Sequence, residues 1–146
     1  MSSTHTSLHY HLIFATKNRA PFIAREWATA LHEYIGGIVR GLDGHSQGVG
    51  GVCDHVHLLI SLKPTHCISH FMRELKKNSC AWAREKDPFF QWQEGYAAFS
   101  VSASMRDTVH RYIAAQEEHH RKKTFLEELV EFFQKSQVPY DGRYLD

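Results

Sequence analysis

The chain has 146 residues, of which 42% are hydrophobic and 23% are charged, and its formal net charge is +1. This balance is typical of one globular domain and excludes a disordered, collagen-like or coiled-coil chain. No apolar run reaches the roughly 18–20 residues that span a bilayer, and the first residues lack the apolar core of a secretory signal. Three cysteines cannot all pair, so the expected location is a reducing cytoplasm.

Hydrophobic periodicity divides the chain into strands and helices. Alternating segments rich in β-forming residues, together with one glycine-rich segment, predict strands at 8–16, 46–53, 55–62 and 96–102. Apolar residues at helical spacing predict helices at 24–40, 68–86, 105–118 and 125–133. The segment 135–146 contains turn-forming proline and glycine and is predicted to be irregular.

The order of these elements predicts an α+β fold. A βαββαβ order is typical of a ferredoxin-like sandwich, an antiparallel sheet with helices on one face, here followed by additional C-terminal helices. We expect a single domain over 1–146, with a core at about 7–118 and a C-terminal helix and tail at about 122–146. The repeated glycines at Gly48, Gly50 and Gly51 weaken strand pairing and indicate a bulge or the close approach of another segment.

Two histidines, His55 and His57, lie two residues apart in the clearest predicted strand. Side chains at i and i+2 share a face, so both imidazoles project together while the intervening apolar residues face the core. Such a pair can hold a divalent cation, but the pattern also arises by chance in a chain with 12 histidines. If the strand extends back by two residues, Cys53 joins the same face and the site suits zinc instead.

Tyr112 and Gln116 lie four residues apart in the predicted helix 105–118, which places them on one face, one turn apart. The glutamine amide offers a hard oxygen ligand that suits Mg²⁺ or Mn²⁺, and the tyrosine phenol can act as a nucleophile. Among the six tyrosines, only Tyr112 has a glutamine one turn away. The alternative is that Tyr112 is a core aromatic and Gln116 is solvated.

Four segments resemble, in this order, the single-tyrosine HUH transposases: YHLIFATKNR, HVHLLISL, EGYAAFSVS and RYIAAQEEHH. This family includes the transposases of the smallest bacterial insertion sequences and the REP-associated tyrosine transposases. The likeness runs from about residue 7 to residue 116, and the tail YDGRYL is also similar. The resemblance implies that His55, His57 and Gln116 bind the divalent metal, Mg²⁺ or Mn²⁺, and that Tyr112 is the catalytic nucleophile.

The resemblance also implies a reaction and its partners. Family members cut single-stranded DNA at imperfect hairpins on element ends, form a 5′-phosphotyrosine link and release a 3′-OH. They typically act as homodimers, in some of which the tyrosine helix of one subunit completes the HUH site of the other. We therefore expect a metal-dependent DNA transposase that cuts and rejoins single-stranded DNA, in the bacterial cytoplasm and at the nucleoid when bound.

Basic residues on several predicted elements suit contacts with DNA phosphates, which fix position rather than base sequence. The candidates are Lys17, Arg19, Arg73, Lys76, Lys77 and Arg111, with Arg84, Arg106, Arg121, Lys122 and Lys123 as further basic residues. Charges on helices are equally typical of a solvated face. The aromatic residues that could stack on unpaired bases, or else pack in the core, are Trp82, Trp92 and Phe99.

Cys53 departs from the family pattern, in which proline or another small residue is common at this place. Two further functions stay open on the sequence alone. One is a non-catalytic nucleic-acid-binding domain of the same fold, which predicts DNA binding that does not depend on His55. The other is a small zinc-binding module that uses Cys53, His55 and His57, which predicts zinc bound through sulfur.

Overall fold

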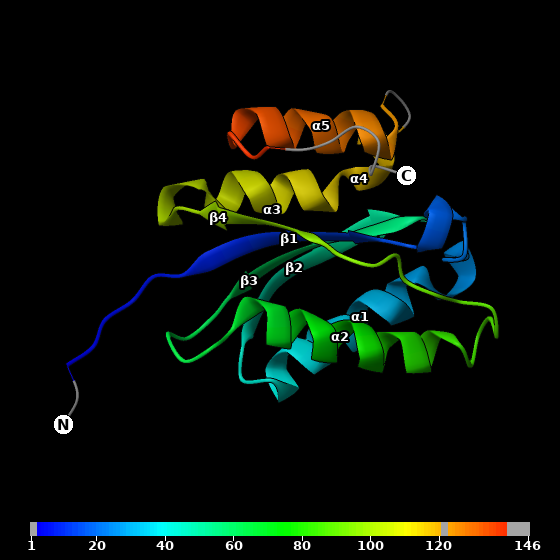
Figure 1. Ribbon diagram of the computed structural model, residues 1–146, viewed down its shortest axis with the longest axis horizontal. Coiled ribbons are helices and arrows are strands. Elements are labelled where there is room, and N and C mark those ends of the chain that lie inside the picture. The colour runs from blue at the N-terminus through cyan, green and yellow to red at the C-terminus, as the bar shows by residue number, and fades with distance from the viewer. Residues whose placement is uncertain (1–2, 121–122, 140–146) are drawn as a thin grey trace.

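The computed structural model describes residues 3–120 and 123–139, which form one sheet with helices on both sides (Figure 1). The strands are β1 (His9–Ala15), β2 (His45–Val52), β3 (His55–Ser61) and β4 (Ala97–Val101). The α-helices are α1 (Arg25–Gly41), α2 (Ile68–Ala83), α3 (Arg106–Ala114), α4 (Gln116–His119) and α5 (Phe125–Lys135). Short 3₁₀ turns, η1 (Lys17–Arg19) and η2 (Ala103–Met105), precede α1 and α3.

Some of the sequence predictions concern residues outside 3–120 and 123–139. The basic residues Arg121 and Lys122, and the part of the predicted irregular tail from residue 140 onward, lie outside the described residues. Within 3–120 and 123–139, no helix has the length and apolar character needed to cross a membrane.

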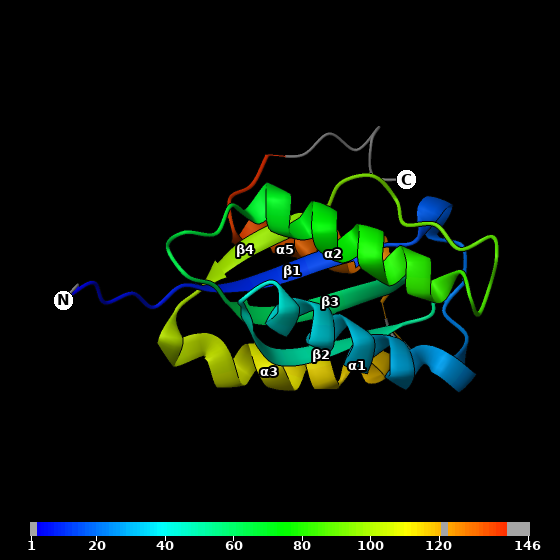
Figure 2. The ribbon, with the colours of Figure 1, turned by 90° about the horizontal axis from the view of Figure 1, so that it is seen from below.

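The sheet has the order β2-β3-β1-β4, and each neighbouring pair of strands is antiparallel. This is the strand order of a ferredoxin-like sheet, so the predicted fold is confirmed. Helices α1 and α2 lie together on one face of the sheet (Figure 2). The central strands point fully buried apolar side chains into this layer: Leu12, Val56, Leu58 and Ile60.

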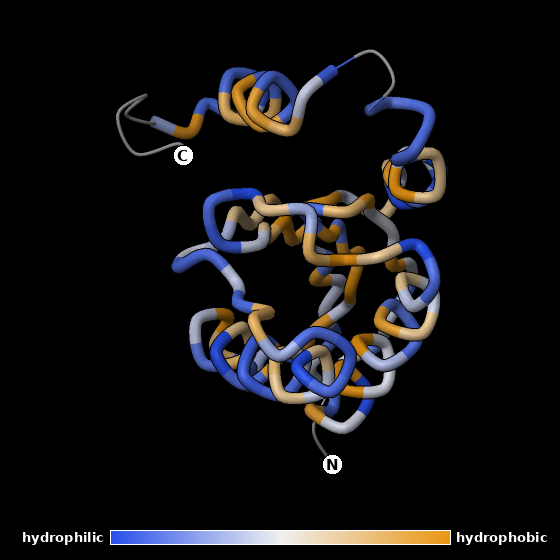
Figure 3. Tube along the Cα trace, turned by 90° about the vertical axis from the view of Figure 1, so that its right-hand side faces the viewer, coloured by the Kyte–Doolittle hydropathy of each residue, from blue (hydrophilic) through white to orange (hydrophobic). Residues whose placement is uncertain are grey.

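The additional C-terminal helices cover the second face of the sheet, which therefore lies between two helical layers (Figure 1). Viewed along α5, Figure 3 shows apolar residues on the side of this helix that is turned toward the sheet. Phe125, Leu129 and Phe132 of α5 pack there with Ile13 and Phe99. The strand pattern contains no signal for this second layer, because alternation in a strand does not say what covers its polar face.

The glycine-rich strand β2 provides the surface on which α3 rests. The pairing of β2 with β3 shifts between Ser46 and Gly48, which is the irregularity that the glycines predict. A methyl group at Gly50 would lie 2.3 Å from the backbone oxygen of Ile113, and one at Gly48 would lie 2.9 Å from a side chain of the same helix. The glycines therefore allow α3 to approach the strand directly, which brings Tyr112 close to the sheet.

The predicted single helix 105–118 is interrupted, and this corrects the sequence prediction. The backbone at Ala115 has φ −102° and ψ 23° and separates α3 from the short helix α4. Tyr112 therefore lies in α3 and Gln116 begins α4, instead of both sharing one continuous helix face. The buried side chain of Gln116 has tertiary hydrogen-bond partners, and these outweigh the local helical preference of the segment.

Replacing Gly50 with Ala is expected to destabilise the fold and to displace α3. The added methyl group would overlap the Ile113 carbonyl oxygen, and over-packing of this kind costs about 1–3 kcal/mol or more. Gly41→Ala is the control, because Gly41 ends α1 and no atom lies within 4 Å of an added Cβ there. Urea denaturation should show a lower free energy of unfolding for Gly50→Ala alone, and equal stability of both variants would contradict the close approach.

Candidate active site

His55 and His57 are fully buried on β3, on the sheet face that the C-terminal helices cover. The Nδ1 of His55 lies 2.7 Å from a carboxylate oxygen of Asp54, and the Nδ1 of His57 lies 2.7 Å from Nε2 of His11. These partners orient the two rings so that both Nε2 atoms point toward α5. The imidazoles thus share one face, as the alternation of the strand predicts.

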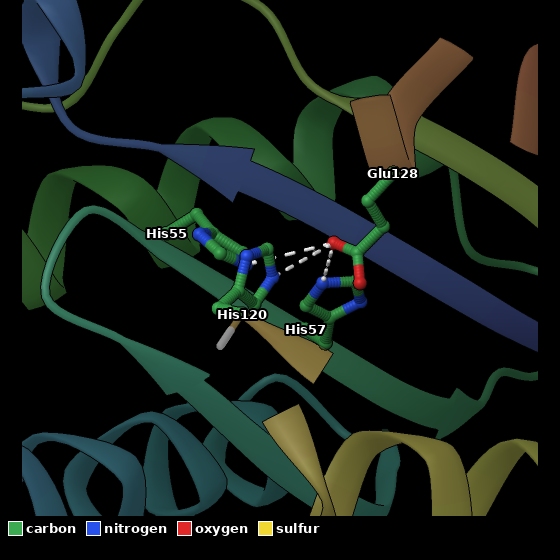
Figure 4. Close-up of side chains that lie close together, drawn as sticks. All are labelled: His55, His57, His120 and Glu128. Carbon is green, nitrogen blue, oxygen red and sulfur yellow. Dashed lines mark hydrogen bonds and ion pairs between the residues drawn. The ribbon is translucent and has the colours of Figure 1, made fainter. Parts of the chain in front are cut away.

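Two residues that the sequence analysis did not single out complete the group, namely His120 after α4 and Glu128 on α5 (Figure 4). The Oε1 atom of Glu128 lies 2.9 Å from Nε2 of His57 and 3.4 Å from Nε2 of His120. One ligand atom from each of His55, His57, His120 and Glu128 lies within 4.8 Å of all the others. Three imidazole nitrogens and a carboxylate oxygen at this spacing fit a divalent metal ion.

Tyr112 and Gln116 reach the same place from α3 and α4. The Oε1 of Gln116 lies 3.0 Å from Nε2 of His55, and its amide nitrogen donates to Oε2 of Glu128 at 3.1 Å. The Tyr112 hydroxyl donates a hydrogen bond to the same Oε2, and its ring centre lies 5.9 Å from that of His57. Gln116 is buried, so the alternative of a solvated glutamine does not hold.

The buried groups hold one another in defined charge states. Burial lowers the pKa of His57 to about 4, and burial together with the charge of His57 lowers the pKa of His11 to about 3. Burial disfavours charge on Glu128 and on His120, but their mutual hydrogen bond and attraction outweigh it, so the pKa of Glu128 is lowered and that of His120 is raised. Burial and Glu128 raise the pKa of Tyr112. A neutral His57 beside an ionised carboxylate is the combination that binds a metal ion.

Without metal, the protein should lose stability as the pH falls from about 6.5 to 4. His11 and His57 have folded pKa values of about 3 and 4, below the value of 6.5 expected for the unfolded chain. In this window the unfolded state binds more protons, so the free energy of unfolding falls with the pH. The raised pKa of His120 acts in the opposite direction, but burial also lowers the pKa of His32, so three histidines act against one. Urea denaturation in EDTA measures the effect, and stability that rises toward pH 4 would contradict it.

Of the site residues that the sequence did not predict, only Glu128 has a sequence pattern that could have revealed it. Glu128 lies with Phe125, Leu129 and Phe132 at the i, i+3, i+4 and i+7 spacing of one apolar helix face. An acid at such a buried position requires a partner, and this is the signal that reveals it. His11 and His120 carry no comparable signal in a chain with 12 histidines.

The structure does not support two sites that the sequence left open, a zinc site at Cys53 and a base-stacking surface of three aromatic residues. Cys53 is exposed in the turn between β2 and β3, and it is not among the described side chains that converge on a common ligand point. The zinc site of Cys53, His55 and His57 is therefore wrong. Of the three aromatic candidates for base stacking, Trp92 and Phe99 are buried in apolar clusters, and the partly buried Trp82 packs against one of them.

The basic residues predicted to contact DNA lie on different sides of the molecule. Lys17 and Arg111 are exposed, in η1 and α3. Arg73 and Lys77 are exposed on α2, across the sheet from the histidine group (Figure 1). Lys76 is half-buried, and its ammonium group donates to two backbone oxygens of the segment before β4, at 2.6 and 2.8 Å. The structure thus brings none of these five side chains into the group itself.

A cavity of about 870 Å³ lies beside the histidine group. Asp54 and His120 line it, so the cavity reaches the edge of the group. Its other lining residues include the basic residues Arg19, Arg25 and Lys123 and also acidic residues. Tyr112, Gln116 and Glu128 do not line this cavity.

The chain is similar to known proteins over most of its length. A family model described as Transposase IS200 like matches residues 4–116. The ISDra2 transposase TnpA of Deinococcus radiodurans is 31% identical over 119 residues, which cover 75% of this chain and 84% of that protein. The resemblance on which the sequence analysis relied is therefore confirmed.

Solved structures agree with the fold. The crystal structure of a protein from Deinococcus radiodurans, described as a candidate transposase, has a TM-score of 0.65 at 27% identity, and the match covers 80% of this chain and 95% of that one. A REP-associated tyrosine transposase bound to a REP hairpin has a TM-score of 0.61 at 17% identity, over 82% of this chain and 74% of that one. The chain belongs to the IS200-like family of DNA transposases.

Proposed function

We propose that this protein cuts and rejoins single-stranded DNA through a covalent link between Tyr112 and a 5′ phosphate. The observation that supports this proposal is the convergence of the Tyr112 hydroxyl, two imidazoles, Gln116 and Glu128 within one chain. A phenol becomes an effective nucleophile when a neighbouring group removes its proton or favours its ionised form. Of the tyrosines in the described residues, only Tyr112 contacts this group.

His55, His57 and Gln116 are the proposed ligands of a Mg²⁺ or Mn²⁺ ion. Their Nε2 and Oε1 atoms point to one place, and Asp54 and His11 orient the rings from behind. A divalent ion held there would supply positive charge at the scissile phosphate and at the oxygen that leaves it. The amide oxygen and the nearby carboxylate favour Mg²⁺ or Mn²⁺ over softer ions.

The proposed reaction uses the chain's own residues to form and protect a covalent intermediate. The Tyr112 oxygen attacks phosphorus, and the 3′ oxygen leaves as a hydroxyl group. The phosphotyrosine bond stores the phosphodiester, so a 3′-OH can later attack it and rejoin the strand without an external energy source. The burial of His55, His57 and Gln116 limits the access of water, which protects this link from hydrolysis.

Hairpin DNA is the proposed substrate, because a structural relative is bound to a REP hairpin. The strand to be cut would approach through the cavity beside His120, where Arg19 can contact phosphates. The remaining proposed phosphate contacts are Lys17 and Arg111, and on the α2 side Arg73, Lys76 and Lys77.

A homodimer is proposed as the working form. In the structure, however, Tyr112 and the two imidazoles meet within one chain, so the partner does not have to supply the nucleophile. Sedimentation velocity at micromolar protein concentration measures the association. We expect a dimer, and a monomer that still forms the covalent adduct would show that one chain is sufficient.

Hairpin oligonucleotides labelled at one end test the proposed reaction. The protein is incubated with MgCl₂ and DNA, and covalent products are separated on a denaturing gel. A 5′-phosphotyrosine link transfers the 3′-labelled fragment to the protein and releases the 5′-labelled fragment with a free 3′-OH. Transfer of the 5′ label contradicts the proposal. Hairpin binding without any adduct in Mg²⁺ or Mn²⁺ favours the alternative, a non-catalytic nucleic-acid-binding domain.

A further inference from the structure

We propose that Glu128 is a further catalytic residue, which accepts the Tyr112 proton with one carboxylate oxygen and faces the metal ligands with the other. The inference rests on the proposed function and deepens it. Glu128 lies on α5, beyond the segment 4–116 that matches the family model, so the family match does not assign it.

The two oxygens of Glu128 face different halves of the site. Oε1 lies 2.9 Å from Nε2 of His57 and 3.6 Å from Nε2 of His55, which is the side of the metal ligands. Oε2 accepts hydrogen bonds from the Tyr112 hydroxyl and from the amide nitrogen of Gln116. The carboxylate therefore connects the nucleophile directly to the residues that would hold the ion.

Helix α5 keeps this carboxylate in place. The side chain of Thr124 caps the helix by accepting a hydrogen bond from the Glu127 backbone nitrogen. The ring of Phe125 stacks on His55 with ring centres 4.4 Å apart, and Phe132 meets Tyr112 edge-on at 5.5 Å. These contacts hold Glu128 beside the Tyr112 hydroxyl group.

A purely structural role would account for only part of this arrangement. An acid that served only to partner the buried histidines would be satisfied by its contacts with His57 and His120. Its second oxygen is instead directed at the one hydroxyl group in the cluster. The next acid along α5, Glu131, is partly exposed and is paired with Lys123 instead.

The proton and the bonds balance in the proposed step. As the Tyr112 oxygen forms its bond to phosphorus, the phenol proton passes to Oε2 of Glu128. The bond from phosphorus to the 3′ oxygen breaks, and this oxygen keeps the electron pair and takes a proton from water. In the rejoining reaction the oxygen of a 3′-OH attacks the phosphorus and gives its proton to water, the bond from phosphorus to the Tyr112 oxygen breaks, and Glu128 returns a proton to the departing phenolate.

Glu128→Gln tests the proposal, because it preserves the shape of the side chain and removes its charge and its ability to take a proton. In the absence of DNA, calorimetric titration with MnCl₂ should show at least about tenfold weaker binding. At saturating metal, the single-turnover rate of adduct formation should fall by about 100-fold or more. Glu131→Gln is the matched control on the same helix and should behave as wild type.

A second variant separates proton transfer from a structural effect. Difluorotyrosine incorporated at position 112 has a phenol that ionises more readily, so it depends less on a proton acceptor. In this background Glu128→Gln should reduce the rate only a few-fold. Wild-type Mn²⁺ affinity in Glu128→Gln, or an equally large rate loss with difluorotyrosine, overturns the proposal. If the wild-type protein forms no adduct, the proposed function fails, while the Mn²⁺ titration still tests Glu128.

Discussion

Replacing Tyr112 with Phe should abolish the covalent protein–DNA adduct and leave hairpin binding within a few-fold of wild type. The substitution removes one oxygen atom, and loss of the nucleophile in covalent catalysis costs on the order of 10⁴-fold or more in rate. The phenyl ring can keep its packing against His119 and Phe132, and Gln116 still donates to Glu128. The fold should therefore persist, which circular dichroism and thermal melting can verify.

Tyr34→Phe is the matched control for this experiment. Tyr34 lies on α1, across the sheet from the site, where its ring stacks on Trp82 with ring centres 5.3 Å apart. The same loss of a hydroxyl group there should leave adduct formation unchanged. A Tyr112→Phe protein that forms the adduct at the wild-type rate would remove Tyr112 from the reaction.

Replacing His57 with Ala should weaken Mn²⁺ binding by at least about 100-fold and stop adduct formation. Loss of an outer-shell partner alone costs about 10–100-fold in metal affinity or activity, so loss of a ligand should cost at least as much. The substitution also removes the side-chain hydrogen-bond partner of His11 and one of the partners of Glu128, which keeps its contacts with Gln116 and His120. Calorimetric titration with MnCl₂, after removal of metal by EDTA, measures the affinity.

His45→Ala is the control for the metal experiment, because His45 is exposed at the start of β2. It should bind Mn²⁺ as the wild-type protein does. If His57→Ala retains wild-type affinity for Mn²⁺, the imidazole pair does not form the metal site. If it binds hairpins normally but forms no adduct, DNA binding and catalysis are separable, as the proposed reaction requires.

The sheet and the positions of the paired imidazoles could be predicted because both follow from a period of two residues. Alternation places Val56, Leu58 and Ile60 in the core and turns His55 and His57 to the other face, and the structure agrees. The glycines of β2 likewise predict an irregular strand, and the register shift at Ser46/Gly48 is such an irregularity.

The rest of the site depends on tertiary contacts that no local pattern encodes. Glu128 lies 71 residues from His57 along the chain, and His11 lies 46 residues from it, so only the folded arrangement brings them together. A continuous helix was the basis for predicting that Tyr112 and Gln116 lie together, but the helix is interrupted at Ala115. Both residues reach the site from two separate helices, and there each donates a hydrogen bond to Glu128.

Peptide mapping of the covalent adduct identifies the side chain that attacks the DNA. The protein is incubated with hairpin DNA and Mg²⁺, digested with nuclease and trypsin, and analysed by mass spectrometry. Cleavage after Arg111 and Arg121 releases the peptide 112–121, and we expect this peptide to carry the nucleotide on Tyr112. A nucleotide attached to another tyrosine, such as Tyr140 or Tyr144 in the tail outside the described residues, would contradict it.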